Sequence, residues 1–393
     1  MVQAGVGCNL DMPRPLVLTL RKDLSRTLRQ GHPWVFREAV TEPRGVAPGA
    51  QVTVADRRGR EIAFGYYDDA GPIAVRVLAL APMADRAALL RERLRAALAT
   101  RRAHLDLSVT NAFRWVHGEA DRLPGIHVDV YADVVSVRFD GEGARAFYRD
   151  LPALIRASAG DLAVRKVIDR DARAGRAEEV EVRENGALFI VDVGRGQKGG
   201  LFLDQRENRQ TIAQRAAGKS VLNLFGYTGG FSLHAARAGA TRTDTVDIAR
   251  PAIAAARHNF ERNGLALGQA GFHAEDVFAF LDKAIARGQV WDIVVSDPPS
   301  FAPSKNSLSA ARRSYLRLHR LAAQVVSRGG ILAAASCSSH VTRGEFLTMV
   351  KTGVDLAGRR FILESYTGAG PDHPILPVFP EGDYLKFAFG RVE

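Results

Sequence analysis

The pattern of apolar positions changes twice along the chain. Up to about residue 80, apolar and polar residues alternate in four short runs, and turn signals such as Pro48-Gly49 separate them. A period of two is typical of strands that bury one face. The pattern therefore predicts a small β-barrel, with strands at residues 16–20, 51–54, 62–67 and 73–77.

The next hundred residues mix helical and strand periods. Leu90, Leu94, Ala97 and Leu98 form one apolar stripe within residues 84–102, as in an amphipathic helix. The polar, turn-rich segment 118–125 is expected on a surface or at a domain junction. The pattern predicts a small α/β unit, with strands at residues 113–116, 126–131, 134–139 and 163–168 and a helix near 144–157.

The last half of the chain alternates buried strands with helices. Residues 171–184 are charged and are expected to form a loop, and residues 188–193 read as a strand. After them, strands are expected at 221–225, 245–247, 271–274, 291–296 and 330–335, with helices at 231–237 and 251–263 between them. This alternation predicts an open parallel α/β sheet, whose ligands bind outside the carboxyl ends of the strands.

Length and composition narrow the class of protein. The 393 residues exceed one ordinary core, so two or three domains are expected. No apolar run is long enough to span a bilayer, and no signal peptide is visible. The two cysteines, Cys8 and Cys337, exclude a disulfide framework or zinc cluster, so we expect a reducing cytoplasm and no metal.

Basic residues exceed acidic ones by 11, which suits a polyanionic partner, although an arginine-rich genome has the same effect. Six arginines lie in residues 86–102 against the single acid Glu92. They fit RNA phosphates and a solvated helix face equally well. For His32, Trp34 and Phe36, we expect filling of the barrel rather than contact with RNA.

The glycine-rich turn after residue 225 predicts a nucleoside site. Its spacing is G-x-x-G-G rather than the G-x-G-x-x-G of dinucleotide folds. Glycines that only cap a strand and a helix are the alternative. Asp247 ends the second strand, where a carboxylate accepts ribose hydroxyls, and Asp276 follows the third strand, where it would accept an adenine amino group. The turn residues assigned to the cofactor are Phe225, Tyr227, Thr228 and Gly229.

A second glycine-rich loop, residues 194–206, leads into the helix before the first central strand. It ends in Asp204-Gln205-Arg206, which brings a carboxylate and a guanidinium to the same ligand edge. Asp204 and Arg206 are therefore assigned to the cofactor. Capping of the following helix by Asp204 is the alternative.

The fourth strand leads into Asp297-Pro298-Pro299-Ser300-Phe301. Two prolines fix the backbone and remove two N–H donors, so Asp297 and the nearby carbonyls form a rigid acceptor array for the amino edge of a nucleobase. Phe301 is expected to stack on the base. Pro298, Pro299, Phe301 and Lys305 are assigned to the substrate; a plain turn is the alternative.

Cys337 follows the fifth strand and reaches the same edge of the sheet. Carbon 5 of a pyrimidine is a poor nucleophile, and addition of a thiolate to carbon 6 activates it. Cys337 is therefore a candidate covalent catalyst. A buried structural thiol is the alternative.

Five short motifs carry a family resemblance. They are Gly31-His32-Pro33-Trp34, Asp204-Gln205-Arg206, the Phe-Gly-Tyr-Thr-Gly-Gly-Phe run at 225–231, Asp-Pro-Pro at 297–299 and Ser-Cys-Ser at 336–338. In this order, over nearly the whole chain, they resemble the PUA-containing, S-adenosylmethionine-dependent cytosine-5 methyltransferases of bacterial large-subunit ribosomal RNA. The resemblance implies a PUA-like RNA-binding barrel (1–82), a central α/β domain (83–185) and a Rossmann-like class I methyltransferase domain (186–393) with a seventh, antiparallel strand.

The resemblance also implies roles for the site residues. Cys337 would be the nucleophile, Asp297 the acid that orients the base, and Asp247 and Asp276 the acceptors for S-adenosyl-L-methionine. Ribosomal RNA would be the partner, without a membrane, and a homodimer is left open. Asp-Pro-Pro-Ser-Phe at 297–301, together with residues 302–305, also resembles guanine-modifying relatives. Two alternatives therefore stay open: a guanine or adenine nitrogen methyltransferase, and an RNA-binding ribosome assembly factor with a vestigial fold.

Overall fold

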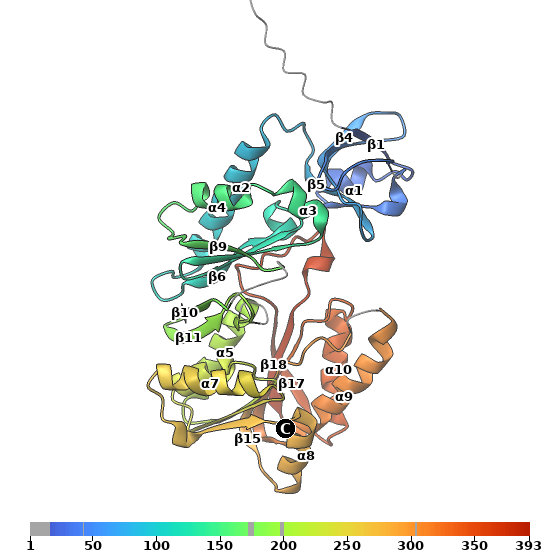
Figure 1. The fold of residues 1–393 in the computed structure, drawn as a ribbon. Helices are drawn as coiled ribbons and strands as arrows, with labels where there is room; N and C mark the ends of the chain where they lie inside the picture. The colour runs from blue at the N-terminus through green and yellow to red at the C-terminus, as the bar shows by residue number, and fades with distance from the viewer. Residues whose placement is uncertain (1–15, 42, 172–176, 197–199, 303–304) are drawn as a thin grey trace, which may run out of the picture.

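The computed structural model describes residues 16–41, 43–171, 177–196, 200–302 and 305–393. Cys8 lies outside these ranges, as do residues 197–199 of the second glycine-rich loop and residues 303–304 beside Lys305. Four sheets follow one another along the chain, and Figure 1 shows the first at the top and the largest at the bottom. The segment 368–385, between the last two strands, rises from the largest sheet to the central one.

The N-terminal sheet has the strand order β1-β3-β4-β5-β2. Its apolar face forms a closed core that includes Val35, Val52, Val54 and Val75. The four predicted strands are confirmed, and the short strand through Trp34 was not predicted. The elements are β1 (Leu16–Thr19), α1 (Ser25–Arg29), β2 (Trp34–Phe36), β3 (Gln51–Ala55), β4 (Glu61–Tyr67) and β5 (Ile73–Ala79).

The prediction that His32, Trp34 and Phe36 fill this core is wrong. Phe36 is exposed, and Trp34 is only half-buried. The Trp34 ring packs edge-on against Phe379, with ring centroids 4.5 Å apart, and Phe379 belongs to the 368–385 segment. Because β2 turns these rings outward, they join the barrel to the C-terminal part of the chain.

The central sheet has the order β6-β7-β8-β9. The predicted stripe of Leu90, Leu94 and Leu98 is buried against it. The single helix expected at 144–157 is two helices, because Pro152 lacks an N–H and suits only a first turn. The elements are α2 (Arg86–His104), β6 (Ala112–His117), β7 (Ile126–Tyr131), β8 (Val134–Phe139), α3 (Glu142–Phe147), α4 (Leu151–Ser158) and β9 (Lys166–Asp169).

Most arginines of α2 bond within the protein rather than face solvent. Arg101 is fully buried and forms two hydrogen bonds with Asp121, of 2.6 and 2.7 Å. Arg93 is also buried and donates to the Leu78 carbonyl at 2.7 Å. Both expectations, contact with RNA phosphates and a solvated face, are therefore wrong for these two residues. Both stay open for Arg91, which is partly exposed, and for Arg95, which is exposed.

A β-hairpin connects the central sheet to the largest one. It pairs β10 (Glu179–Glu184) with β11 (Ala187–Asp192). The prediction of a loop over 171–184 is wrong for β10, although residues 172–176 lie outside the described ranges. Val180 and Val182 are buried and alternate with exposed charged residues, so the charge of this segment concealed a strand with one buried face.

The largest sheet has the order β14-β13-β12-β15-β16-β18-β17, with β18 antiparallel to both neighbours. Helices α5 and α6 pack on one face, and α8, α9 and α10 on the other. The Rossmann-like α/β prediction is confirmed. The strands are β12 (Ser220–Leu224), β13 (Arg242–Asp247), β14 (Ala270–Ala274), β15 (Trp291–Ser296), β16 (Val326–Ser336), β17 (Phe361–Thr367) and β18 (Lys386–Val392). The helices are α5 (Arg206–Ala216), α6 (Gly230–Arg237), α7 (Arg250–Arg262), α8 (Val277–Ala286), α9 (Leu308–Gln324) and α10 (Arg343–Asp355).

Candidate functional site

The carboxyl ends of β12, β13 and β14 form the first part of the site, here called the cofactor edge. Phe225 and Tyr227 adopt left-handed backbone conformations, with φ of 57° and 47°. Such strain in residues other than glycine gathers at functional sites. The Asp247 carboxylate accepts the N–H groups of Tyr227 and Ala249, both at 2.9 Å. Asp247 thus holds the turn in place, and each of its oxygens keeps a lone pair for a ligand.

The predicted turn residues Thr228 and Gly229 support the cofactor edge from behind. Thr228 is buried, and its hydroxyl donates to the Gly200 carbonyl at 3.4 Å. Gly229 has φ of 80°, and a Cβ there would lie 2.9 Å from the Ala256 Cβ. Only glycine fits this position, so the turn is packed tightly between β12 and α7.

Asp276 lies at the end of β14 and is exposed. One of its oxygens accepts the Ala279 N–H at 3.0 Å, which caps α8. The preceding residue, Glu275, donates its N–H to the Asp247 carbonyl at 3.0 Å. The two predicted cofactor carboxylates therefore end neighbouring strands that are tied together at their tips.

The three residues of the Asp-Gln-Arg motif are buried, and each bonds a different part of the chain. Asp204 accepts the phenol O–H of Tyr384 at 2.6 Å, and Gln205 donates to the Asp297 carboxylate at 2.9 Å. Arg206 forms a paired contact with Asp372, at 2.7 and 3.0 Å. Gln205, which was not predicted as a site residue, is thus the direct support of Asp297.

Two expectations for this motif change. Arg206 was assigned to the cofactor, but its guanidinium is only 1% exposed and is committed to Asp372 and Glu207. It holds the 368–385 segment rather than facing a ligand. The alternative of a helix cap is wrong for Asp204, because α5 begins after Gln205 and the Asp204 carboxylate bonds Tyr384.

The Asp-Pro-Pro loop packs against the C-terminal half of the sheet. Pro298 is buried and Pro299 exposed. The Phe301 ring is half-buried. Its centroid lies 5.0 Å from that of the Tyr315 ring and 6.4 Å from that of the Phe225 ring, so protein already covers part of it. Lys305 begins a short 3-10 helix, Lys305–Ser307.

Cys337 is held between two anchored serines. Ser336 and Ser338 are buried, and their hydroxyls lie 2.8 and 3.2 Å from the Tyr315 phenol oxygen. Ser338 also lies 2.9 Å from the Ser300 hydroxyl, which links this turn to the Asp-Pro-Pro loop. Cys337 itself is half-exposed and lines a cavity, so the alternative of a buried structural thiol is wrong.

A buried cation lies beside this turn. Lys386 is paired with Ser336 across β16 and β18, and its ammonium donates to the carbonyls of Ser338 and Tyr384, at 2.6 and 2.8 Å. Burial lowers the pKa of Lys386 to about 8, and the negative charge of a Cys337 thiolate opposes that shift. Lys386 thus places a positive charge near the Cys337 turn.

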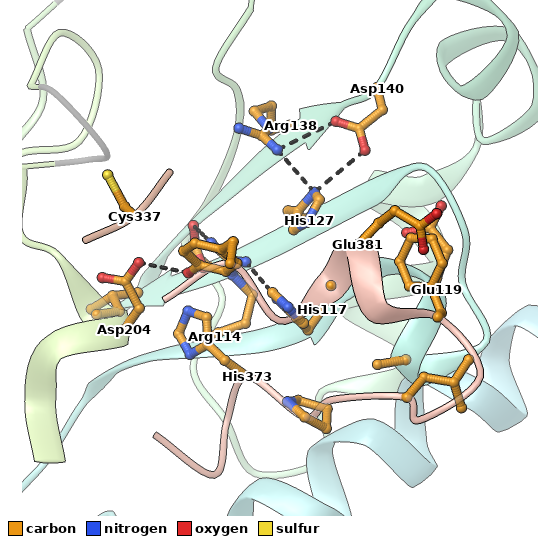
Figure 2. Close-up of a pocket in the computed structure, with 18 of the residues that line it drawn as sticks. Arg114, His117, Glu119, His127, Arg138, Asp140, Asp204, Cys337, His373 and Glu381 are labelled. Carbon is orange, nitrogen blue, oxygen red and sulfur yellow. Dashed lines mark hydrogen bonds and ion pairs between the residues drawn. The ribbon is translucent and has the colours of Figure 1, made fainter. Parts of the chain in front are cut away.

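The cavity beside Cys337, here called the interdomain cavity, has a volume of about 380 Å³. Such a volume is typical of sites for small molecules. Figure 2 shows Cys337 and Asp204 at one end and Glu119 and Glu381 at the other. All parts of the chain contribute: Trp34 from the N-terminal sheet, Arg114, His117 and His127 from the central sheet, and His373 and Tyr384 from the 368–385 segment.

The far wall of the cavity consists of fixed polar pairs. Glu119 accepts hydrogen bonds from the Trp34 indole at 2.8 Å and from Arg76 at 2.9 Å, which places the 118–125 segment at a domain junction. Burial, together with nearby positive charge, holds the pKa of His117 and His127 well below the ordinary value. These imidazoles are neutral near pH 7, so they offer hydrogen bonds rather than charge.

Asp372 fixes the 368–385 segment to both neighbouring domains. Its carboxylate pairs with Arg206 and accepts the Arg114 N–H at 2.9 Å, and its carbonyl accepts from Arg101 at 2.8 Å. Burial opposes ionisation, yet His373 and Arg206 hold the pKa of Asp372 well below the ordinary value. A buried carboxylate with these partners keeps its charge and determines how the domains meet.

Two family models together match most of the chain. A family model described as S-adenosylmethionine-dependent methyltransferase matches residues 171–363, and a PUA-like domain model matches residues 18–80. "Ribosomal RNA large subunit methyltransferase I" from Photobacterium profundum is 36% identical, over 93% of this chain and 97% of that protein. "Ribosomal RNA large subunit methyltransferase" from Deinococcus radiodurans is also 36% identical, over 96% and 98%. The chain belongs to this family of PUA-containing, S-adenosylmethionine-dependent methyltransferases.

A solved structure agrees on the fold. A putative S-adenosylmethionine-dependent methyltransferase from Streptococcus mutans superposes with a TM-score of 0.81, over 96% of this chain and 100% of that one, at 22% identity. Within the described ranges, no helix is long and apolar enough to cross a membrane. Nor does any group of three or more His, Cys, Asp and Glu side chains in those ranges have the geometry of a metal site.

The cofactor edge fits S-adenosylmethionine, the cofactor of this family. Asp247 and Asp276 lie where acceptors for ribose hydroxyls and an adenine amino group are predicted, and the strained turn at Phe225 and Tyr227 brings main chain to the same place. Arg206 does not belong to this set, because its hydrogen bonds are taken within the protein.

Proposed function

We propose that this protein methylates carbon 5 of a cytosine in large-subunit ribosomal RNA through a covalent adduct with Cys337. The observation that carries the proposal is the placement of Cys337: a half-exposed thiol between two buried, hydrogen-bonded serines, at the end of a cavity next to the Asp297 edge. A nitrogen methyltransferase does not need a thiol there. The names of the relatives support ribosomal RNA as the substrate.

The residues act in a defined order. Asp297, held by Gln205, accepts a hydrogen bond from the amino group of cytosine and so orients the ring. The Cys337 sulfur, as a thiolate, bonds to carbon 6 and turns carbon 5 into a nucleophile, with the Lys386 ammonium as a nearby positive charge. S-adenosylmethionine, when bound at the cofactor edge, supplies the methyl group for carbon 5.

A base inside a helix cannot reach this site. It must leave its stack and enter the interdomain cavity, at a cost of about a few kcal/mol that is smaller in loops. We therefore expect the target to be a cytosine in a loop or junction. The PUA-like domain would hold the surrounding RNA through phosphate contacts. Localisation in the cytoplasm and formation of a homodimer stay predictions.

The test is the identity of the methylated nucleoside. Unmethylated large-subunit RNA is incubated with the protein and S-adenosylmethionine, digested to nucleosides and analysed by mass spectrometry. The proposal expects 5-methylcytidine. A methylated guanosine or adenosine instead would overturn it in favour of a nitrogen methyltransferase. A protein that binds RNA but neither methylates it nor binds S-adenosylhomocysteine would be an assembly factor.

A further inference from the structure

The proposed reaction leaves one proton without an assigned acceptor. After methylation, carbon 5 carries both the new methyl group and its original hydrogen, and the bond between carbon 6 and Cys337 cannot break until that hydrogen leaves as a proton. Cys8, the other cysteine, lies outside the described residues, and His340 does not line the cavity. The missing base must therefore be sought among the residues around Cys337. This inference rests on the proposed function.

Asp204 is the carboxylate at the Cys337 end of the interdomain cavity, as Figure 2 shows. Hydrogen bonds link the backbone beside Cys337 to Tyr384, and the Tyr384 side chain bonds Asp204. The carbonyl of Ser338, next to Cys337, accepts from Lys386, which also donates to the Tyr384 carbonyl; the Tyr384 phenol in turn donates to Asp204. The neighbouring Gln205 holds Asp297. Asp204 thus lines the same cavity as Cys337 and is the chain neighbour of the residue that holds Asp297.

Four other titratable groups of the cavity are less suitable. Asp129 is paired with Arg114, and Glu119 is paired with Arg76 towards the opposite end. The imidazole of His117 is buried and that of His127 partly buried, and both lie next to arginines. Their pKa is held well below the ordinary value, which makes them weak proton acceptors. Position therefore favours Asp204.

We propose that Asp204 is the catalytic base that resolves the covalent adduct. One carboxylate oxygen takes the proton from carbon 5, the electrons of that C–H bond re-form the double bond between carbons 5 and 6, and the bond from carbon 6 to sulfur breaks, which returns the Cys337 thiolate. Asp204 becomes a carboxylic acid and releases its proton to water in the cavity. Tyr384 orients the carboxylate through its O–H.

The test follows the adduct on ordinary cytosine RNA. Asp204→Asn and Asp204→Ala are studied in parallel, with S-adenosylmethionine present. Both variants should accumulate a methylated protein–RNA adduct that survives denaturation and decays at least about 100-fold more slowly than that of the wild type, the usual contribution of a general base. Tyr384→Phe is the matched control: it loses the same hydrogen bond but keeps the base, and should accumulate no comparable adduct.

Three further results separate failure of this proposal from failure of the proposed function. On RNA with 5-fluorocytosine, whose carbon 5 cannot lose a proton, wild type and both Asp204 variants should all be trapped. Trapping there, combined with normal release from ordinary RNA, would overturn the role of Asp204 and leave the function intact. No trapping even of the wild type would overturn the function itself. Loss of S-adenosylhomocysteine binding in both variants, at unchanged melting temperature, would make Asp204 a cofactor ligand and also overturn the proposal.

Discussion

The cofactor edge and the interdomain cavity lie at the same end of the large sheet but are built in opposite ways. At the cofactor edge, the site residues come from one stretch of sequence and each ends a strand, so backbone geometry places Tyr227, Asp247 and Asp276. In the cavity, Trp34, Asp204 and Tyr384 come from distant parts of the chain, and side-chain pairs place them. The first depends on a local fold, and the second depends on how distant parts of the chain pack together.

This difference separates binding from chemistry. A change in the cavity should slow the reaction and leave cofactor affinity intact. A change at the cofactor edge should weaken cofactor affinity and leave the chemistry at Cys337 intact. The buried pair of Arg206 and Asp372 belongs with the cavity, because it holds the 368–385 segment that supplies His373 and Tyr384.

The largest expected effect is that of Cys337→Ala. Removing a nucleophile that acts together with its neighbours typically lowers the rate by a factor on the order of 10⁴ or more. We expect that loss in methyl transfer to RNA, with an unchanged Kd for S-adenosylhomocysteine in calorimetry. Ser339→Ala, at an exposed position two residues away, is the control and should keep full activity. A weakened Kd in Cys337→Ala would contradict the separation of the two regions.

Asp372→Asn should come next, with a loss of about 3–5 kcal/mol in the free energy of unfolding, because it removes the buried counter-charge of Arg206 and leaves only the exposed Glu207 carboxylate. Glu364→Gln, at the exposed pair with Arg215, should cost about 1 kcal/mol or less. Denaturant titration measures both. Equal losses would mean that the buried pair does not hold the domains together.

Asp372 also predicts a pH dependence. Its pKa is depressed in the folded state, so its stabilisation is present above the unfolded value of about 3.9 and is lost as the pH falls through the folded pKa. Unfolding of the wild type should therefore become easier below about pH 4, and Asp372→Asn should flatten this part of the profile. A variant with the same acid slope as the wild type would show that other carboxylates cause it.

The two regions also differ in how far the sequence predicts them. The five parallel strands of the large sheet and the residues Phe225, Tyr227, Asp247 and Asp276 follow from apolar runs with glycines or acids at their ends, which are local signals, whereas the pattern did not predict β17 and β18. The β10 strand was not predicted, because charged residues cover its outer face.

The cavity could not be predicted in the same way, because its contacts are long-range. Tyr384 meets Asp204 across 180 residues, and Asp372 meets Arg206 across 166. Asp-Gln-Arg pointed to the right place, but Arg206 turned out to bind the protein itself, and Gln205 to hold Asp297. A motif shows that residues are needed together; only the packed domains show which partner each one meets.

Asp247→Ala should have a smaller effect than Cys337→Ala and Asp372→Asn. The substitution removes the hydrogen-bond acceptors for the ribose and for the Tyr227 N–H. Their loss should reduce the free energy of binding by about 1.5–3 kcal/mol, which weakens the Kd for S-adenosylhomocysteine roughly 10- to 100-fold. Asp282→Ala, at an exposed position on α8, is the control. An unchanged Kd for Asp247→Ala would remove this carboxylate from the cofactor edge.

The smallest effect is expected on the surface of α2. Replacing Arg91 and Arg95 by Gln should weaken RNA binding and reduce the slope of log affinity against log salt by about 1–2, if both contact phosphates. Arg93 is left unchanged because it is buried. Replacing Arg257 and Lys351 by Gln removes the same charge elsewhere and serves as the control. Equal slopes in the two double variants would make Arg91 and Arg95 a solvated face.

The central claim is that the chemistry occurs through Cys337 in the interdomain cavity, and trapping with 5-fluorocytosine RNA tests it most directly. Wild-type protein, S-adenosylmethionine and the modified RNA are combined, denatured and separated by size, and the adduct is mapped by mass spectrometry. The account predicts an adduct at Cys337 in the wild type and none in Cys337→Ala. If Cys337→Ala instead methylates ordinary RNA at the wild-type rate, the covalent mechanism is contradicted and a nitrogen methyltransferase takes its place.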